Sequence, residues 1–197
     1  LEVAAALPKL ASLKLRSSAI TDDGLKHLKD LTKLRGLHLE DADVSDEGLL
    51  SIQGLTALDD LNLLRVPIGD EGMAALANMT NMKQLILRGT YVGDEGLLHL
   101  AKMKELSKLD LSETGVQGPG LAATAGSKLK WLNLWNSFVD DSAAEHLAKL
   151  QNLEYLNLDA TLISDDGLQK LKNLKKLKTL SATQTSISKE AAEDLKK

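Results

Sequence analysis

Residues 153–176 read LEYLNLDATLISDDGLQKLKNLKK and contain the pattern on which the rest of the chain is built. Leu156 and Leu158 alternate with polar residues, which is typical of a strand with one buried face. A polar run follows, and then Leu168, Leu171 and Leu174 recur every three residues, a spacing that places them on one face of a helix. This stretch therefore predicts one short strand followed by one amphipathic helix.

The same pattern recurs along the whole chain at a nearly constant spacing. Each unit begins 24 residues after the one before it, except for one step of 23 residues. The eight units begin at Leu10, Leu34, Leu58, Met82, Leu106, Leu129, Leu153 and Leu177, and residues 1–9 end a preceding unit. No linker interrupts this frame, so we predict a single domain over residues 1–197. Because a strand and a helix bury little by themselves, the units must stack on one another.

The position before each predicted helix holds residues that commonly cap helices. It is occupied by Thr21, Ser45, Gly69, Gly93, Asp140, Ser164 and Ser188, with Gln117 as the exception. A short side-chain oxygen accepts an otherwise unpaired amide of the first turn, and acidic residues in that turn complement the helix dipole. A small residue follows three positions later: Gly24, Gly48, Gly72, Gly96, Gly120, Ala143, Gly167 and Ala191. Two interpretations are open: stacked neighbours leave no room for a larger side chain, or the helix begins only after this residue.

The fifth unit departs most from the pattern. It is one residue short, it has Gln117 at the capping position, and Thr124 replaces a leucine of the helix stripe. Because Leu121 is the only leucine left at its three stripe positions, we expect the lowest local stability here. Native-state hydrogen exchange should show residues 117–127 less protected than residues 165–174, and equal protection would refute this expectation.

The motif LxxLxLxxTxI(T/S)D(D/E)GLxxLxxL, seen from Leu153 to Leu174, resembles the leucine-rich repeats, specifically the helix-bearing kind with an ITDxGL signature. The resemblance extends over all eight units. It implies an α/β fold, a leucine-rich-repeat solenoid in the form of a right-handed horseshoe or arc. A parallel β-sheet is expected on its concave face and α-helices on its convex face, with the leucines forming a continuous core between them.

The ITDxGL wording also resembles the repeats of F-box ubiquitin-ligase adaptors, which usually carry a cysteine between the strand and the helix. Here that position holds Ser18, Ala42, Val66, Thr90, Thr114, Ser137, Thr161 and Thr185. The chain contains no cysteine and no visible F-box segment. Its mix of threonine, serine and small apolar residues is more similar to bacterial members of the class. An F-box-like substrate receptor is therefore the less favoured alternative.

Composition and spacing argue against several kinds of site. The 24 basic and 28 acidic residues nearly balance, so no nucleic-acid partner is expected. Without cysteine, disulfides, thiolate metal sites and a cysteine nucleophile are excluded, and no apolar run is long enough to span a membrane. The acidic pairs lack the spacing of a calcium loop, while His27, His99 and His146 fall on helices too far apart to share a metal. We predict no metal site and no cofactor.

A catalytic site is not predicted either. His38 is the histidine that falls on the expected concave face, and we expect no fixed acid or serine beside it in an adjacent unit. No nucleophile, base and orienting group converge in the repeat frame, so the chain is not expected to be an enzyme.

Strand side chains opposite the core leucines point to the concave face, because successive residues of a strand alternate sides. Trp131, Trp135 and Tyr155, three of the five aromatic residues, fall on this face in adjacent units. Aromatic groups with polar neighbours are typical of binding hot spots. The polar neighbours expected here are Asn133, Asn157 and Asp159. A second, smaller candidate consists of Leu64 and Ile86 beside Arg65 and Arg88.

The predicted function is therefore non-catalytic recognition of a protein or peptide by the concave face. One alternative is a structural or targeting segment of a larger multidomain protein. Another is a glycan-binding module that uses the two tryptophans as stacking platforms, and a third reading is that the rings only shield the concave surface or contact a missing segment.

Both ends of the sequence lack a polar capping element. Leu1, Ala4 and Leu7 repeat the register of a helix stripe, and the last predicted helix turns Ala191, Ala192 and Leu195 inward. Because solenoids need polar caps for solubility, we expect a piece of a longer protein or a domain whose ends meet something else. End-to-end self-association through these termini is compatible with the same pattern.

Overall fold

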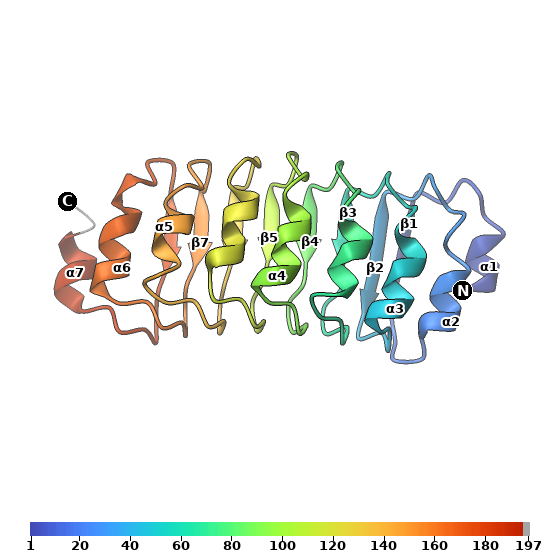
Figure 1. Cartoon of the computed structure of the whole chain (residues 1–197), viewed down its shortest axis with the longest axis horizontal. Coiled ribbons are helices and arrows are strands. Elements are labelled where there is room, and N and C mark those ends of the chain that lie inside the picture. Colours follow the sequence, from blue (N-terminus) through green and yellow to red (C-terminus); the bar gives the residue numbers. More distant parts are fainter. Residues whose placement is uncertain (195–197) are drawn as a thin grey trace.

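The computed structural model describes residues 1–194, apart from the side chains at positions 192 and 194. Eight parallel strands form one open sheet in the order of the sequence, and the helical segments lie along one side of it (Figure 1). The strands are β1 (Ser12–Arg16), β2 (Gly36–Glu40), β3 (Asp60–Asn62), β4 (Gln84–Ile86), β5 (Lys108–Asp110), β6 (Trp131–Asn133), β7 (Tyr155–Asn157) and β8 (Thr179–Ser181). This confirms the predicted fold class. We call the exposed face of the sheet the concave face.

The register of the sheet follows the repeat frame of the sequence. Each strand residue pairs with its equivalent in the next unit, as Leu61 does with Leu85 and Leu85 with Leu109. The step of 23 residues is absorbed outside the strands, because Leu109 still pairs with Leu132. Equivalent side chains therefore form straight rows across the sheet.

The helical segments are short, and several of them are 3₁₀ helices. They are α1 (Glu2–Ala5), α2 (Asp22–Lys26), α3 (Asp46–Leu49), η1 (Leu50–Ile52), η2 (Gly72–Leu76), α4 (Asp94–Leu97), η3 (Leu98–Leu100), η4 (Pro119–Thr124), α5 (Ala144–Leu147), α6 (Asp165–Lys170), η5 (Leu171–Asn173) and α7 (Lys189–Asp194), where η marks a 3₁₀ helix. The expectation of an α-helix in every unit is thus wrong for units three and five, where the segment is 3₁₀. The leucine spacing gives the reason: a 3₁₀ helix has about 3 residues per turn, so residues three apart lie on one face.

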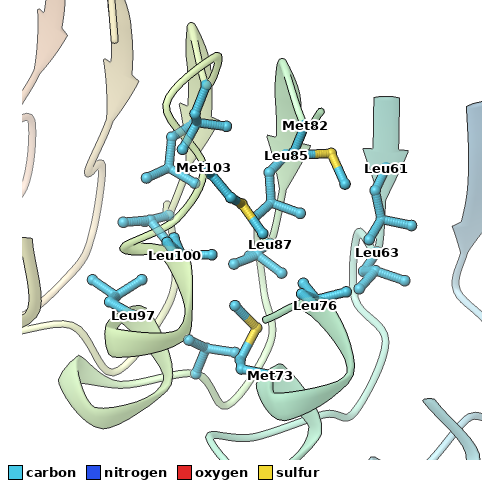
Figure 2. Close-up of a cluster of buried hydrophobic side chains, with 14 of the residues drawn as sticks. Leu61, Leu63, Met73, Leu76, Met82, Leu85, Leu87, Leu97, Leu100 and Met103 are labelled. Atoms are coloured by element: carbon cyan, nitrogen blue, oxygen red, sulfur yellow. The ribbon is translucent and has the colours of Figure 1, made fainter. Parts of the chain in front are cut away.

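The core is a continuous layer of leucines between the sheet and the helical segments. Leu61, Leu85 and Leu97 are completely buried, and Leu100 and Met103 are 1% exposed. Figure 2 shows these side chains from strands and helical segments pointing toward one another. Each unit contributes apolar side chains to this layer and packs against its neighbours. A single unit therefore has no core of its own.

A sharp turn follows each of the strands β2 to β8 and was not predicted from the sequence. Six non-glycine residues have φ between +53° and +58°, and Gly89 has φ of +69°. All occupy the same repeat position: Asp41, Arg65, Gly89, Glu113, Asn136, Ala160 and Gln184. Except at Gln184 in the last unit, their amides continue the sheet ladder, as when Arg65 N–H donates to the Arg88 carbonyl at 2.8 Å. The left-handed backbone is therefore held in place by hydrogen bonds between units, which offset its conformational cost of about 1–2 kcal/mol per residue.

In six units, an aspartate near the start of the helical segment is hydrogen-bonded to the next unit. Asp46 accepts the amide of Gly69 at 2.7 Å, and Asp70 accepts that of Gly93 at 2.6 Å. Equivalent bonds run from Asp22, Asp94, Asp141 and Asp165 to the backbone of the following unit. These carboxylates thus satisfy amides at the next helix start as well as complementing their own helix dipole.

The predicted capping side chains play a partial role. Ser45, Ser164 and Ser188 accept amides of their own helices at 3.1 to 3.3 Å, and Asp140 accepts the amide of Ser142 at 2.8 Å. Thr21 makes no side-chain cap. Glycine has no side chain to offer, so the aspartate of the preceding unit takes over at Gly69 and Gly93.

The same aspartates explain the recurring glycine. A Cβ on Gly96 would lie 2.6 Å from Asp70 Oδ1, closer than two such atoms can approach. Cβ atoms on Gly48, Gly72 and Gly167 would likewise collide with the aspartate of the preceding unit. This confirms that stacked neighbours leave no room there. Unit five has Gly118 in place of the aspartate, and the next unit carries Ala143 in place of glycine.

The two ends follow the predicted register only in part. Leu1 and Ala4 pack against the core. Leu7 is 51% exposed, so the expectation that it faces inward is wrong. Ala191 is buried. The burial of Ala192 and all of Leu195 lie outside the described residues. Among residues 1–194, no helix has the length and apolar character needed to cross a membrane.

Candidate functional site

Trp131 and Tyr155 stack on each other on the concave face. They are directly paired in the register of β6 and β7, and their ring centroids lie 5.1 Å apart with an interplanar angle of 7°. Neighbouring strands are about 4.8 Å apart, so paired residues on one face are at stacking distance. Lys108, the partner of Trp131 on β5, holds its Nζ 4.8 Å from the Trp131 ring centroid. Because β6 lies between β5 and β7, the two faces of Trp131 are covered from opposite sides.

The Trp135 ring packs against a residue two units closer to the N-terminus. The Arg88 Cζ atom lies 5.1 Å from the Trp135 ring centroid, although Arg88 belongs to unit four and Trp135 to unit six. Ser112, the equivalent residue of the unit between them, is completely buried. Arg88 Nε also donates to Glu113 Oε2 at 2.6 Å, which fixes the guanidinium. We call Arg88, Lys108, Trp131, Trp135 and Tyr155 the ring cluster.

The polar neighbours of the rings are occupied in part by the scaffold. Asn133 Oδ1 accepts the Trp135 amide at 3.1 Å, and Asn157 Oδ1 accepts the Asp159 amide at 2.8 Å. Asp159 accepts the hydroxyl of Ser181 at 2.7 Å and the amide of Thr183. Partial burial raises the pKa of Asp159, but these hydrogen bonds outweigh it and hold the pKa below its ordinary value. Asn133 thus positions the turn that carries Trp135, whereas Asn157 and Asp159 position the turns of the next two units.

The structure does not bring the four residues of the second candidate site together. Leu64 and Ile86 are half-buried on neighbouring units, and Arg88 joins the ring cluster. Arg65 turns away to Asp41, which it contacts through two hydrogen bonds of 2.5 and 2.9 Å. Hydrogen bonds from Arg65 and then Arg16 lower the pKa of Asp41 to about 2. This Arg–Asp–Arg row holds three units in register.

His38 has an acidic partner that the sequence analysis did not expect. Its Nε2 lies 2.9 Å from Asp60 Oδ2 on the adjacent strand, so the expectation of no fixed acid beside it is wrong. The reason is the register, which places Gly36 opposite Asp60 and brings the His38 ring across to the neighbouring carboxylate. In the described part of the chain, this pair lacks the hydrogen-bonded nucleophile that a catalytic His–Asp pair requires.

Sequence reasoning missed a row of apolar residues along one edge. Tyr91 is 76% exposed, Phe138 62% and Leu162 64%. With Pro67 and Gly115 they occupy one repeat position in five successive units, in the loops that lead from each strand to its helix. We call these five residues the edge row. A signal was present in the sequence, because polar Asp43 and Ser186 hold the same position in outer units.

Within residues 1–194, no group of three or more histidine, aspartate or glutamate side chains is placed to hold a metal ion.

A family model described as Leucine Rich repeat matches residues 6–29 and 30–52. These matches fall on the first units of a sheet whose every strand repeats the same leucine register. The fold is that of a leucine-rich-repeat solenoid. A comparison with curated proteins gives no match.

Solved leucine-rich-repeat structures are similar over nearly the whole chain. Internalin C2 of Listeria monocytogenes is 26% identical with a TM-score of 0.74, over 94% of this chain and 76% of its own. The internalin InlF of the same organism is 23% identical with a TM-score of 0.71, over 99% of this chain and 61% of its own. The plant peptide hormone receptor RGFR1, solved in complex with RGF2, is 21% identical with a TM-score of 0.60, over 90% of this chain and 33% of its own. The last two likenesses concern the fold alone.

Proposed function

We propose that the chain recognises a protein or peptide through its concave face, with the ring cluster as the anchor. The observation that carries this proposal is the gathering of Trp131, Trp135 and Tyr155, half-buried, on one exposed sheet surface. Tryptophan, tyrosine and arginine are the residue types most enriched in binding hot spots. A receptor with the same fold, RGFR1, forms a complex with RGF2, which supports this mode of action.

The members of the ring cluster pack against one another in the absence of a partner. Trp131 is held between Lys108 and Tyr155, and Trp135 is held against Arg88. Side chains that are already ordered lose less conformational entropy on binding. A partner can therefore dock on the ring edges and on the two cations without reorganising them.

The same stacking argues against glycan binding through Trp131. A sugar that stacks on an aromatic residue needs an open ring face, and both faces of Trp131 are covered by Lys108 and Tyr155. Protein recognition is thus the better supported of the two alternatives. If the chain is only a structural or targeting segment, changes in the ring cluster should alter no binding at all.

Trp135→Ala should weaken binding of a partner by about 30-fold, which corresponds to the loss of about 2 kcal/mol expected for a hot-spot residue. The partner is obtained by capture on the immobilised chain from an extract of the organism that makes it, with a Trp131→Ala/Trp135→Ala variant as the parallel bait. Proteins held by the parent and lost by the double variant are purified for titration calorimetry.

Gln84→Ala is the matched control, because Gln84 is an exposed concave residue of β4 outside the ring cluster. It should leave the dissociation constant unchanged. A partner that binds Trp135→Ala as tightly as the parent, while circular dichroism shows both folded, would contradict the proposal.

A further inference from the structure

The edge row is a rigid line of exposed apolar residues. A second ladder of hydrogen bonds fixes it: the amides of Tyr91, Gly115 and Phe138 donate to carbonyls of the preceding unit at 2.8, 2.9 and 3.0 Å. The Leu162 amide continues the ladder at 2.8 Å. Exposed apolar groups held in a fixed line are typical of a contact surface, and nothing in the core needs them.

Gly115 opens a gap in the middle of this row. Tyr91 and Phe138 stand two units apart, which is about 10 Å at the usual spacing of neighbouring strands. One aromatic or large aliphatic side chain placed above Gly115 would lie about 5 Å from each ring, within the range in which aromatic groups attract. These residues and Leu162 line an open groove with a volume of about 570 Å³.

The fold does not require a glycine at position 115. A Cβ there would meet the Val92 carbonyl oxygen at 3.4 Å and other atoms at 3.9 Å, which are ordinary contacts. By contrast, a Cβ on Gly96 would lie 2.6 Å from Asp70 Oδ1. Packing therefore explains why position 96 is a glycine. At position 115 there is room for a side chain, and its absence opens the groove.

Acidic residues of the helix starts follow the edge row along the chain and form a border beside it. The segments 69–72, 93–96, 117–120, 140–143 and 164–167 contain eight aspartates and glutamates and no lysine or arginine. The first acid of most of these segments is bound to the next unit, but Glu71, Glu95, Asp140 and Asp166 are exposed. Such a border attracts a positively charged partner and repels a negative one.

This charge pattern selects among the classes of occupant. A second copy of the chain, related by a two-fold axis through this edge, would bring acidic residues toward acidic residues. An anionic membrane surface would be repelled in the same way. A basic protein segment is the occupant that matches both the apolar gap and the acidic border.

We propose that this edge groove binds a basic protein segment, which inserts one large apolar side chain above Gly115 between Tyr91 and Phe138 and places lysines or arginines on the acidic helix starts. The groove lies next to the ring cluster, because Arg88 contacts Glu113 of its lining, and it adds a second binding site to the proposed function.

Gly115→Phe tests the groove because its own ring fills the gap. A displayed library of random twelve-residue peptides is first cleared on immobilised Gly115→Phe and then selected on the parent chain. The retained peptides should share one aromatic or leucine side chain within three residues of at least two lysines or arginines. A synthetic retained peptide should bind Gly115→Phe at least tenfold more weakly than the parent, and more weakly at high salt.

Ala19→Phe is the matched control, since Ala19 is the exposed equivalent of Gly115 in unit one. It should keep the parental affinity, as should Trp135→Ala, which separates this site from the ring cluster. Phe138→Ser is a second test that changes only an exposed side chain and should also lose at least tenfold.

The proposal is overturned if no peptide is retained above background, if the retained peptides lack basic residues, or if Phe138→Ser binds like the parent. A dimer in sedimentation velocity that Gly115→Phe dissociates would show that the occupant is a second copy, and would overturn it as well.

Discussion

Asp94→Ala should lower the free energy of unfolding by about 3 kcal/mol or more, because one carboxylate accepts three amides of unit five. Asp94 accepts the amides of Gln117, Gly118 and Gly120 at 2.9, 3.0 and 2.7 Å. Gly118 and Gly120 are buried, so water cannot readily replace the lost acceptor. Urea denaturation of the parent and the variant measures the difference.

Two matched variants separate the effect of the Asp94 hydrogen bonds from the effect of removing a negative charge. Asp70→Ala removes the acceptor of one amide, that of Gly93, and should cost about 1–2 kcal/mol. Asp30→Ala changes an exposed acid and should stay within about 0.5 kcal/mol of the parent. Hydrogen exchange in Asp94→Ala should accelerate first at Gly118 and Gly120. Equal urea midpoints for Asp94→Ala and Asp30→Ala would show that the hydrogen bonds of Asp94 contribute nothing to stability.

Leu156→Ala should cost about 2–5 kcal/mol of stability, since it opens a cavity in the continuous leucine layer. Leu156 is completely buried and is paired with Leu132 and Leu180 on the neighbouring strands. Stacked units hold each other in place, so the loss is felt by both neighbours.

Leu98→Ala removes the same atoms from a residue that is 54% exposed, and should change stability by no more than about 0.5 kcal/mol. Thermal and urea unfolding of the two variants compare them directly. A loss at Leu98 as large as that at Leu156 would contradict the division between the core and the helix surface.

The positions of the core leucines could be predicted from the sequence because the pattern is local and is repeated eight times. The repeat gave the strands, their parallel order and the buried leucines at Leu61, Leu85 and Leu109 correctly. It left two explanations of the recurring glycine open. The close approach of Gly96 and Asp70, which belong to different units, decides between them, and only the structure shows it.

Part of the candidate site was also readable. Trp131 and Tyr155 were expected together because both follow the register of the sheet, and they stack. The contact of Trp135 with Arg88 spans two units and depends on side-chain conformation, which the repeat pattern does not specify. Whether these rings bind a partner remains a prediction.

The edge row was missed for another reason. Tyr91 and Phe138 lie in loops, outside the strand and helix periods that were used to sort buried from exposed positions. Only the structure shows that these loops are hydrogen-bonded in line and that their side chains point into solvent.

Hydroxyl-radical footprinting of the chain, alone and with its purified captured partner, tests recognition by the ring cluster most directly. Aromatic side chains react readily with the radical, and three of the five lie on the concave face while Tyr91 and Phe138 lie on the edge. We expect the bound partner to lower oxidation of Trp131, Trp135 and Tyr155. Unchanged oxidation of both tryptophans in the complex would contradict recognition by the concave face.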